Sequence, residues 1–383
     1  MFQYTENKDQ KGKPQVIFVQ NSVHLAGAQK SLSRVLASTV LGDYEPILIT
    51  SVSGWLTKFA ESVGVTVITS KFPSSRSLKA KLYNNKQFAK SISLKIRLLL
   101  TEGRAIVVHA NDHPDSIIAL EISKALSAQS VITLRTPGMS KRDFFKYQCH
   151  QHDAIISVGD DLHNRASAWA PNCQHVLIYN GVTSDEFYPP RDVRPEPINR
   201  VLVLGSADER KGWQDLFSAL SIIENSTAVK IFPEVVFLGD QFGVNPAERF
   251  QANSLKKFKV SFQQPVEDYA GVIRSFPLVI HPSRSESFGM SALETVAAGV
   301  PLLAASTGMI PQFIGNEDFL YPPGDIESLV KRISTLFDLD ECEIAKRFKI
   351  EVRQNYIETH FTTQQTLNKL SEIYIDLMKD EFI

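Results

Sequence analysis

The chain has 383 residues, of which 43% are hydrophobic and 22% are charged, and its formal net charge is −1. This length predicts two or three domains, each with its own core, and the balanced charge gives no evidence for a nucleic-acid partner. Three scattered cysteines without a CxxC pair exclude a disulfide framework. The polar start and the absence of a run of about 20 apolar residues predict a cytoplasmic protein.

The first half of the chain alternates short apolar runs with helical patterns. Strands are predicted over residues 15–20, 46–50, 66–70, 105–109, 130–134, 153–158 and 175–179, with helices between most of them. This alternation predicts an α/β fold with a parallel sheet. The first strand leads through Gly27 into a helix but lacks GxGxxG spacing, which argues against a dinucleotide-binding dehydrogenase.

Residues 71–101 contain several lysines and arginines and no acidic residue. Phe88, Ile92, Ile96 and Leu99 are spaced to form an apolar side on a helix. Such a basic amphipathic helix is typical of contact with an anionic membrane surface, which we slightly favour. The alternative is a helix whose apolar side packs on the sheet. A nucleic-acid surface is a weaker interpretation because aromatic residues are sparse.

Polar residues follow two strands of the first half. His109 and Asn111 lie at the end of one strand, and Arg135 follows the next. Ligands of open α/β sheets gather at these carboxyl ends. Arg135 is a candidate to bind a donor phosphate or an anionic acceptor, or it has a structural role alone. Cys149 and the nearby histidines lack further ligands at useful spacing, so no metal site is predicted.

The charged, proline-rich residues 189–197 predict an extended linker between two domains. A second series of strands and helices follows, and its central stretch is residues 281–304. There Ser287 is a plausible N-cap for a helix over 288–298. The N-terminus of such a helix can bind a phosphate. Glu286 could then accept hydrogen bonds from sugar hydroxyls and Glu294 could bind a ribose, although two glutamates at this spacing also occur by chance.

This stretch resembles the signature of the retaining GT-B glycosyltransferases, specifically family 4. The residues in register are Pro282, Ser283, Glu286, Phe288, Gly289, Glu294, Ala297, Gly299 and Pro301. The resemblance covers nearly the whole chain and is densest over 200–325. It implies an α/β fold of two Rossmann-like domains facing a central cleft, with residues 1–188 and 200–362 joined by a linker over 189–199. A last helix, about 363–383, would cross back to the first domain.

The resemblance also implies site residues. The catalytic candidates are Glu286, Lys211, Arg210, Asn111 and His109. The donor-binding candidates, with Arg135 added, are Ala26, Gly27, Arg135, Gly205, Ser206, Pro265, Val266, Ser287, Phe288, Gly289, Met290 and Glu294. Ser206 replaces an arginine of the family, Asn111 replaces a histidine and Gln312 a glutamate. These departures put full activity in doubt, and Arg210 is expected to supply the missing charge.

A family member of this kind would transfer a hexose from a UDP- or GDP-sugar to a hydroxyl acceptor with retention of configuration. The resemblance implies a glycan or lipid-linked acceptor in polysaccharide, lipopolysaccharide or glycolipid synthesis, at the inner face of the cytoplasmic membrane. No cofactor and no metal are expected, because the only Asp-x-Asp sequence, at Asp338 and Asp340, lies at a helix end. Alternatives are a non-catalytic sugar-nucleotide-binding protein, a sugar-nucleotide epimerase and a membrane-surface scaffold.

Overall fold

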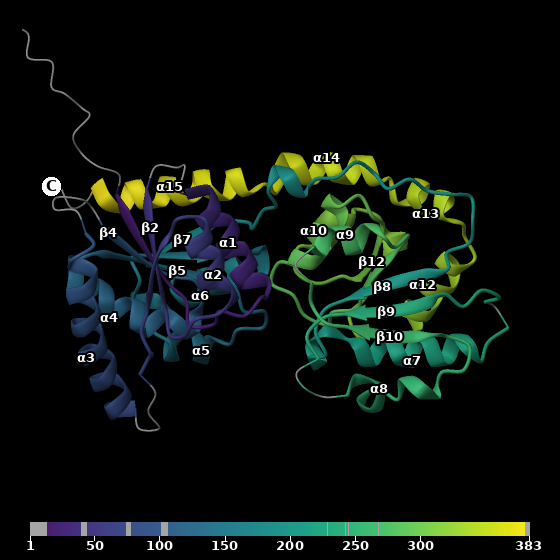
Figure 1. Ribbon diagram of the computed structural model, residues 1–383, viewed down its shortest axis with the longest axis horizontal. Coiled ribbons are helices and arrows are strands. Elements are labelled where there is room, and N and C mark those ends of the chain that lie inside the picture. Colours follow the sequence, from purple (N-terminus) through teal and green to yellow (C-terminus); the bar gives the residue numbers. More distant parts are fainter. Residues whose placement is uncertain are drawn as a thin grey trace, which may run out of the picture. The chain divides into compact units, whose positions relative to one another are not determined.

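The computed structural model describes residues 14–39, 44–73, 78–100, 106–227, 229–241, 243, 245–266 and 268–379. The chain forms two compact units (Figure 1). The first unit ends at Gly181 and resumes at Thr363, and the second runs from Val182 to Thr362. The chain therefore passes between the units twice, and Val182 and Thr362 pair as an isolated parallel bridge beside these passages.

Within the described residues, the first unit has a seven-stranded parallel sheet in the order β3-β2-β1-β4-β5-β6-β7. Its strands are β1 (Gln15–Val19), β2 (Glu45–Thr50), β3 (Thr66–Thr69), β4 (Ile106–Ala110), β5 (Gln129–Leu134), β6 (Ala154–Ser157) and β7 (Gln174–Leu177). The strand order reverses at β1, where Val19 lies opposite both Ile49 and Ala110. The carboxyl ends of β1 and β4 are therefore the expected position of a ligand.

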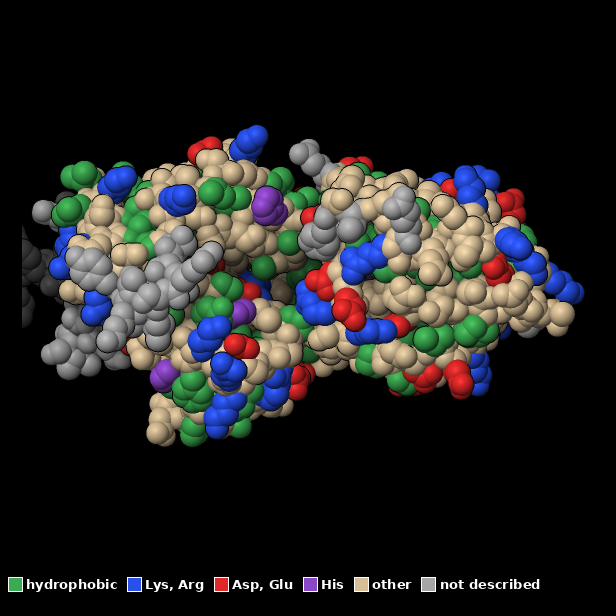
Figure 2. Space-filling model, turned by 90° about the horizontal axis from the view of Figure 1, so that it is seen from below, with side chains coloured by type: hydrophobic (Ala, Val, Ile, Leu, Met, Phe, Trp, Pro, Cys, Tyr) green, Lys and Arg blue, Asp and Glu red, His purple; other side chains and the backbone are tan. Residues whose placement is uncertain are grey.

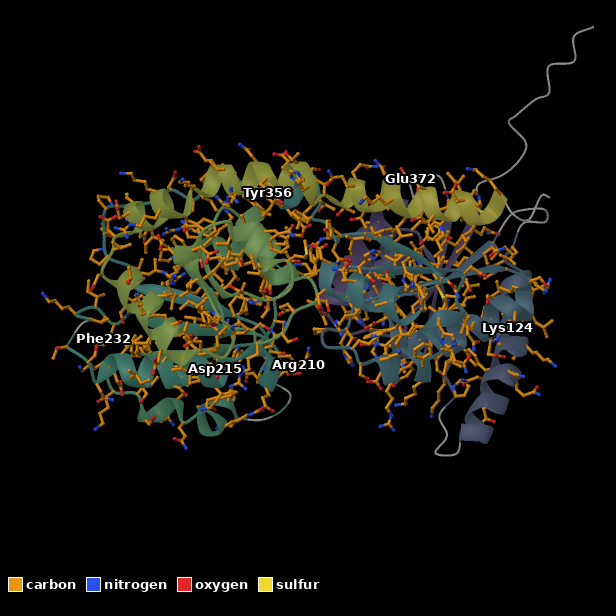
Figure 3. The ribbon with its side chains drawn as sticks, turned by 180° about the vertical axis from the view of Figure 1, so that it is seen from behind. Lys124, Arg210, Asp215, Phe232, Tyr356 and Glu372 are labelled. Carbon is orange, nitrogen blue, oxygen red and sulfur yellow. The ribbon has the colours of Figure 1, made fainter. Side chains whose placement is uncertain are left out.

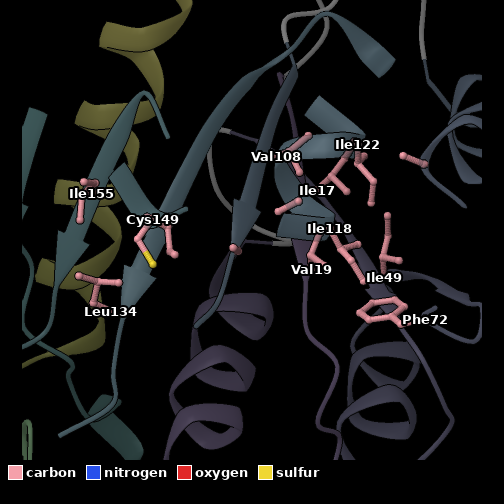
Figure 4. Packing of buried hydrophobic residues seen from close by; sticks show 14 of the residues in the cluster. Ile17, Val19, Ile49, Phe72, Val108, Ile118, Ile122, Leu134, Cys149 and Ile155 are labelled. Carbon is pink, nitrogen blue, oxygen red and sulfur yellow. The ribbon is translucent and has the colours of Figure 1, made fainter. Parts of the chain in front are cut away.

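Helices cover both faces of this sheet. One face carries α1 (Gly27–Thr39), α2 (Trp55–Ser62) and α15 (Thr363–Lys379), and the other carries α3 (Leu78–Arg97), α4 (Ser116–Leu126), α5 (Lys141–Lys146) and α6 (Asp160–Trp169). Figure 4 shows part of the core between the sheet and the helices α3, α4, α5 and α6. There Ile17 and Val19 of β1 pack with Ile118 and Ile122 of α4. Strands covered on both faces need continuous apolar runs, which is the pattern that the sequence has.

Most of the apolar side of α3 is buried inside the first unit. Ile92 and Ile96 are 1% and 0% exposed, and Phe88 is partly buried against the same core. This is the packing on the sheet that the sequence left as the alternative, so these three residues are not available to a membrane. Leu99, the fourth residue of the predicted side, is 46% exposed.

The second unit has, among its described residues, a six-stranded parallel sheet in the order β10-β9-β8-β11-β12-β13. Its strands are β8 (Arg200–Leu204), β9 (Glu234–Leu238), β10 (Val260–Gln263), β11 (Val279–His281), β12 (Leu302–Ala305) and β13 (Leu320–Tyr321). Its helices are α7 (Trp213–Glu224), α8 (Pro246–Arg249), α9 (Tyr269–Arg274), α10 (Met290–Ala297), α11 (Ile310–Ile314), α12 (Ile326–Phe337), α13 (Glu341–Phe348) and α14 (Ile350–His360). The order reverses at β8, which lies between β9 and β11.

The sequence pattern also predicts a helix that ends at Lys257 and a helix over 341–360, and both are shorter in the structure. The first region contains α8 and a short 3-10 turn, and the second is divided into α13 and α14. Gln251 and Lys349 lie after the shortened helices with φ angles of 52° and 56°. Non-glycine residues rarely adopt this left-handed conformation, and nothing in their side chains indicates it in the sequence.

The segment predicted as a linker is part of the second unit. Tyr188 N donates to Ala297 O at 3.1 Å, and Arg191 forms a 2.6 Å ion pair with Glu341. The first unit ends at Gly181 rather than at residue 188, because these contacts hold the following segment on the second unit.

The last helix returns to the first unit, as predicted. Leu370, Tyr374 and Leu377 of α15 are buried in the core that α1 and α2 also cover. None of the described helices has the length and apolarity that crossing a membrane requires.

Candidate active site

Two loops of the second unit meet at the carboxyl ends of β8 and β11. These strands pair with each other, so the loops that follow them lie side by side. Gly212 ends the first loop with a φ of 69°, and a Cβ atom there would overlap the carbonyl oxygen of Pro282 in the second loop. Glycine is therefore required at this position both for its conformation and for the close approach.

This approach brings Lys211 and Glu286 together. Lys211 Nζ donates to Glu286 Oε1 at 2.6 Å, and His281 Nε2 lies 3.6 Å from the same oxygen and 2.8 Å from Ser291 Oγ. Burial alone would raise the pKa of Glu286, but the charge of the nearby Lys211 holds this pKa below its usual value. Burial lowers the pKa of His281 to about 4. The site is therefore an ammonium–carboxylate pair beside a neutral imidazole.

The second loop leads into α10, whose first N–H groups have no partner within the helix. The helix begins at Met290, after Gly289 with a φ of 100°. The prediction of a start near Phe288 with Ser287 as N-cap was wrong, because the left-handed Gly289 takes the cap position. Ser287 Oγ is buried and has no hydrogen-bond partner among the described residues.

Glu294 lies on α10 and is 8% exposed. Sequence reasoning missed its neighbour Tyr269, which opens α9. Burial raises the pKa of Tyr269, and the charges of Glu294 and Glu286 raise it further, so the phenol lies near both carboxylates. The loop that precedes α9 contains Pro265, which is exposed, and Val266, which is half-buried. In the sequence, Tyr269 could have been identified as a site residue because it closely follows Pro265 and Val266, which are predicted to bind the donor.

Arg210 is not part of the Lys211–Glu286 pair. Its side chain is 53% exposed and lies 3.3 Å from Asp208 Oδ2 in the same loop, at the rim of the second unit (Figure 3). Gly205 and Ser206 are half-buried at the start of this loop. That Arg210 supplies to a diphosphate the charge missing at Ser206 stays a prediction.

A second cation, Arg284, was not predicted as a site residue. Its Nε donates to Asp215 Oδ2 at 2.7 Å, and Asp215 is buried on α7 (Figure 3). The hydrogen bond with Asp215 raises the pKa of Arg284. This pair anchors the loop that carries Glu286. No local pattern predicts this pair, since the partners are 69 residues apart in the sequence.

His109 of β4 lies in the interior of the first unit. Its Nδ1 is 2.6 Å from the hydroxyl of Tyr374 on α15, and its Nε2 is 2.7 Å from Thr133 Oγ1. Burial lowers the pKa of His109 to about 3, and the nearby Arg135 lowers it as well. The imidazole is therefore neutral, and neither ring nitrogen is open to a ligand.

Asn111 follows β4 and is 1% exposed. Its Nδ2 donates to Gln20 Oε1, and its two oxygens accept from Nε of Arg135 at 2.9 and 3.2 Å. Asn111 thus joins the ends of β1, β4 and β5. Ala26 and Gly27, at the start of α1, are both exposed.

The described residues contain no group of three or more His, Cys, Asp or Glu side chains that could hold a metal ion. His152, from the cluster that sequence reasoning set aside, instead has its Nε2 2.9 Å from Ser116 Oγ. Burial lowers the pKa of His152 to about 3. Gln312 lies on α11 and is exposed.

Residues 184–355 match the family model of glycosyl transferases group 1. This part of the chain is therefore similar to the glycosyl transferases group 1. The chain is 24% identical over 273 residues to an uncharacterized glycosyltransferase of Methanocaldococcus jannaschii and 25% identical over 350 residues to a sulfoquinovosyl transferase of Arabidopsis thaliana. These alignments cover 66% and 82% of this chain and 74% and 64% of the two relatives. The chain thus spans less than two thirds of the length of the plant protein.

Two crystal structures have a similar fold. A glycosyltransferase from Rickettsia africae has a TM-score of 0.75 and 17% identity, with 96% of this chain and 99% of that chain covered. The Anabaena protein HepE in complex with UDP-glucose has a TM-score of 0.74 and 15% identity, with 94% and 99% covered. These similarities confirm the predicted fold class, in which two α/β units each contain a parallel sheet, as in the GT-B fold.

Proposed function

We propose that this protein is a group 1 glycosyltransferase that transfers a hexose from a UDP- or GDP-sugar to a hydroxyl acceptor, with retention and in the manner of family 4. The observation that carries the proposal is the 2.6 Å contact of Lys211 with Glu286 beside the N-terminus of α10. A cation and a helix N-terminus together favour a diphosphate. The UDP-glucose complex of HepE supports a nucleotide sugar as the donor.

In the proposed reaction, the bond between the sugar carbon C1 and the donor phosphate oxygen breaks while C1 bonds to the acceptor oxygen on the same face. The released phosphate oxygen takes the proton of the acceptor hydroxyl, so no protein nucleophile is needed. Lys211 and the first N–H groups of α10 stabilise the charge of the leaving diphosphate. Glu286 accepts hydrogen bonds from sugar hydroxyls, and Glu294 with Tyr269 holds the ribose. We propose that these groups act without a metal ion.

The test is calorimetric titration and thermal unfolding with UDP-, GDP- and ADP-sugars in the presence of EDTA. We expect one nucleotide sugar to stabilise the wild type by about 2.7 kcal/mol at 100 times its dissociation constant. Glu294→Ala should weaken this binding about tenfold or more, since the ribose hydroxyls lose the carboxylate that accepts their hydrogen bonds. Glu351→Ala, an exposed position on α14, is the control and should bind like the wild type. A wild type that binds none of the nucleotide sugars would refute the proposal.

A second candidate is a protein that binds a sugar nucleotide without transfer. It is favoured by Ser206 at the expected arginine position and by the pairing of Arg210 with Asp208. An epimerase is the remaining alternative. After a donor is found, release of free nucleotide distinguishes transfer or hydrolysis from binding alone, and a change of sugar configuration identifies the epimerase.

We further propose that the first unit contacts the anionic inner face of the cytoplasmic membrane, where a glycan or lipid-linked acceptor resides. Leu94 and Leu98 of the α3 region are 68% and 87% exposed. They lie among the exposed Lys90 and Lys95, and Figure 2 shows basic side chains beside hydrophobic ones on this unit. Residues 74–77 and 101 of the predicted membrane segment lie outside the described residues.

A further inference from the structure

Arg135 is a cation that directly follows β5 in the first unit. The described residues contain no Asp or Glu oxygen within ion-pair distance of its guanidinium. The side chain is half-buried and helps to line a small cavity with Asn111, Thr133 and Asn180. Burial lowers the pKa of Arg135 to about 10. The nearby charge of Asp112 offsets part of this lowering, but no described carboxylate replaces the lost hydration through direct contact with the guanidinium.

Neutral oxygen atoms hold the guanidinium in a fixed orientation. Nε donates to the main-chain and side-chain oxygens of Asn111 at 2.9 and 3.2 Å. Nη1 donates to Asn180 Oδ1 at 2.7 Å and to Ser31 Oγ at 3.2 Å. Ser31 Oγ in turn donates to the same Asn180 oxygen at 2.7 Å. Nη2 has no hydrogen-bond partner in the described part of the chain, so one edge of the fork remains available.

The nearest acidic side chain, Asp112, is engaged elsewhere. Its carboxylate accepts the main-chain N–H groups of His113 and of Arg135 itself, and it also accepts the hydroxyl of Thr136. The buried His109 is neutral at physiological pH and adds no charge. The arrangement therefore positions a cation without neutralising it, which is the arrangement expected of a site for an anion.

We propose that Arg135 binds an anionic group, a phosphate or a carboxylate, carried by the acceptor. The site is built entirely from the first unit, at the carboxyl ends of β4 and β5 and beside α1. The second unit has its own cation and helix N-terminus for the donor diphosphate, so the cation at Arg135 serves a second anionic group. The assignment to the acceptor rests on the proposed transferase function.

The probe is inorganic phosphate, with succinate as the carboxylate counterpart. Both are titrated by calorimetry into Lys211→Gln, in which the anion site of the second unit is weakened. The same titrations are made with Arg135→Gln and with Arg135→Lys in the Lys211→Gln background. The matched control is Arg332→Gln in the same Lys211→Gln background. Arg332 lies on α12, and its side chain is 30% exposed. A separate titration measures the binding of UDP-sugar to the wild type and to Arg135→Gln.

We expect at least one of the two anions to bind Lys211→Gln and to bind about tenfold more weakly when Arg135→Gln is added, since a charge-assisted pair is lost. Arg332→Gln should leave this affinity unchanged. If Arg135→Gln does not fold by circular dichroism, Arg135→Lys decides, because lysine keeps the charge but cannot make the fixed fork. Arg135→Lys should weaken the binding of the anion several-fold.

Equal affinities with and without Arg135 would overturn the site. A UDP-sugar affinity that falls together with the phosphate affinity would show that the anion is the donor diphosphate, and the acceptor assignment would be wrong. A wild type that binds no nucleotide sugar refutes the transferase proposal instead, and the phosphate titrations still decide whether Arg135 is an anion site.

Discussion

The family resemblance placed Lys211 and Glu286 in one site, and the structure brings them together because each follows a strand and the two strands are neighbours in a parallel sheet. What the sequence could not show is that they form a 2.6 Å pair with each other. A diphosphate that approaches Lys211 must therefore share the ammonium with Glu286. The neutral His281 beside them does not add to this charge, because its ring is buried.

The burial of His281 predicts a pH dependence of stability. Its pKa falls from 6.5 to about 4 on folding, so the unfolded chain takes up a proton before the folded chain does. The free energy of unfolding should decrease as the pH falls through this window, by about 2 kcal/mol between pH 8 and pH 5. His281→Asn should remove this part of the slope. Urea unfolding of both proteins at pH 8 and pH 5 measures it.

His360→Asn, at an exposed position on α14, is the control and should retain the slope of the wild type. The buried His109 and His152 contribute equally to all three proteins and cancel in the comparison. Identical slopes for His281→Asn and the wild type would contradict the prediction.

Residue-level errors of the sequence interpretation have physical causes. Ser287 is a favourable N-cap residue, but Gly289 can adopt a φ of 100°, so the helix begins later. Tyr269 was missed because its significance depends on which carboxylates the fold places around it. His109 was expected in an open site, but Tyr374, from a helix 265 positions further along the chain, covers it.

At the scale of elements, α3 has two apolar sets. Periodicity identified Phe88, Ile92 and Ile96, which pack on the sheet because a helix beside a parallel sheet must bury one side. Leu94 and Leu98 are outside this set and are exposed. The sequence alone could not tell which set faces solvent, because both lie between lysines. The proposed membrane contact is therefore assigned to the exposed set, Leu94 and Leu98.

We expect the protein to sediment with phosphatidylglycerol vesicles and not with phosphatidylcholine vesicles. Leu94→Gln with Leu98→Gln should reduce this binding about tenfold or more, since each leucine inserted into the interface contributes more than 1 kcal/mol. Lys90→Gln with Lys95→Gln should reduce it similarly at low salt, at about 1 kcal/mol for each charge. Binding is measured by co-sedimentation over a range of lipid concentrations.

The control is Ile222→Gln, which replaces another exposed apolar residue, 50% exposed on α7 of the second unit. It should bind vesicles like the wild type. Equal binding by the leucine variant and this control would exclude α3 as the contact surface.

At the scale of the whole molecule, the alternation of strands and helices was sufficient to predict two parallel α/β units. The boundary was less predictable. Residues 189–199 look like a linker because they are charged and rich in proline, but the main chain of Tyr188 and the side chain of Arg191 hold this segment on the second unit. Such contacts leave no pattern in the local sequence.

The first unit is assembled from two pieces of chain, which predicts how the molecule responds to truncation. Six apolar side chains of α15 are buried in the first unit: Leu367, Leu370, Ile373, Tyr374, Leu377 and Met378. At about 1.5–3 kcal/mol for each buried side chain, their loss costs roughly 9–18 kcal/mol, which is comparable with the 5–15 kcal/mol that stabilises an ordinary domain. A chain ending at residue 362 should therefore keep the second unit folded and lose the first. Limited proteolysis with mass spectrometry should find cleavage sites concentrated before Gly181 and a resistant fragment from about Val182 onward. Equal protection of both units in the truncated chain would mean that the sheet and its remaining helices suffice without α15.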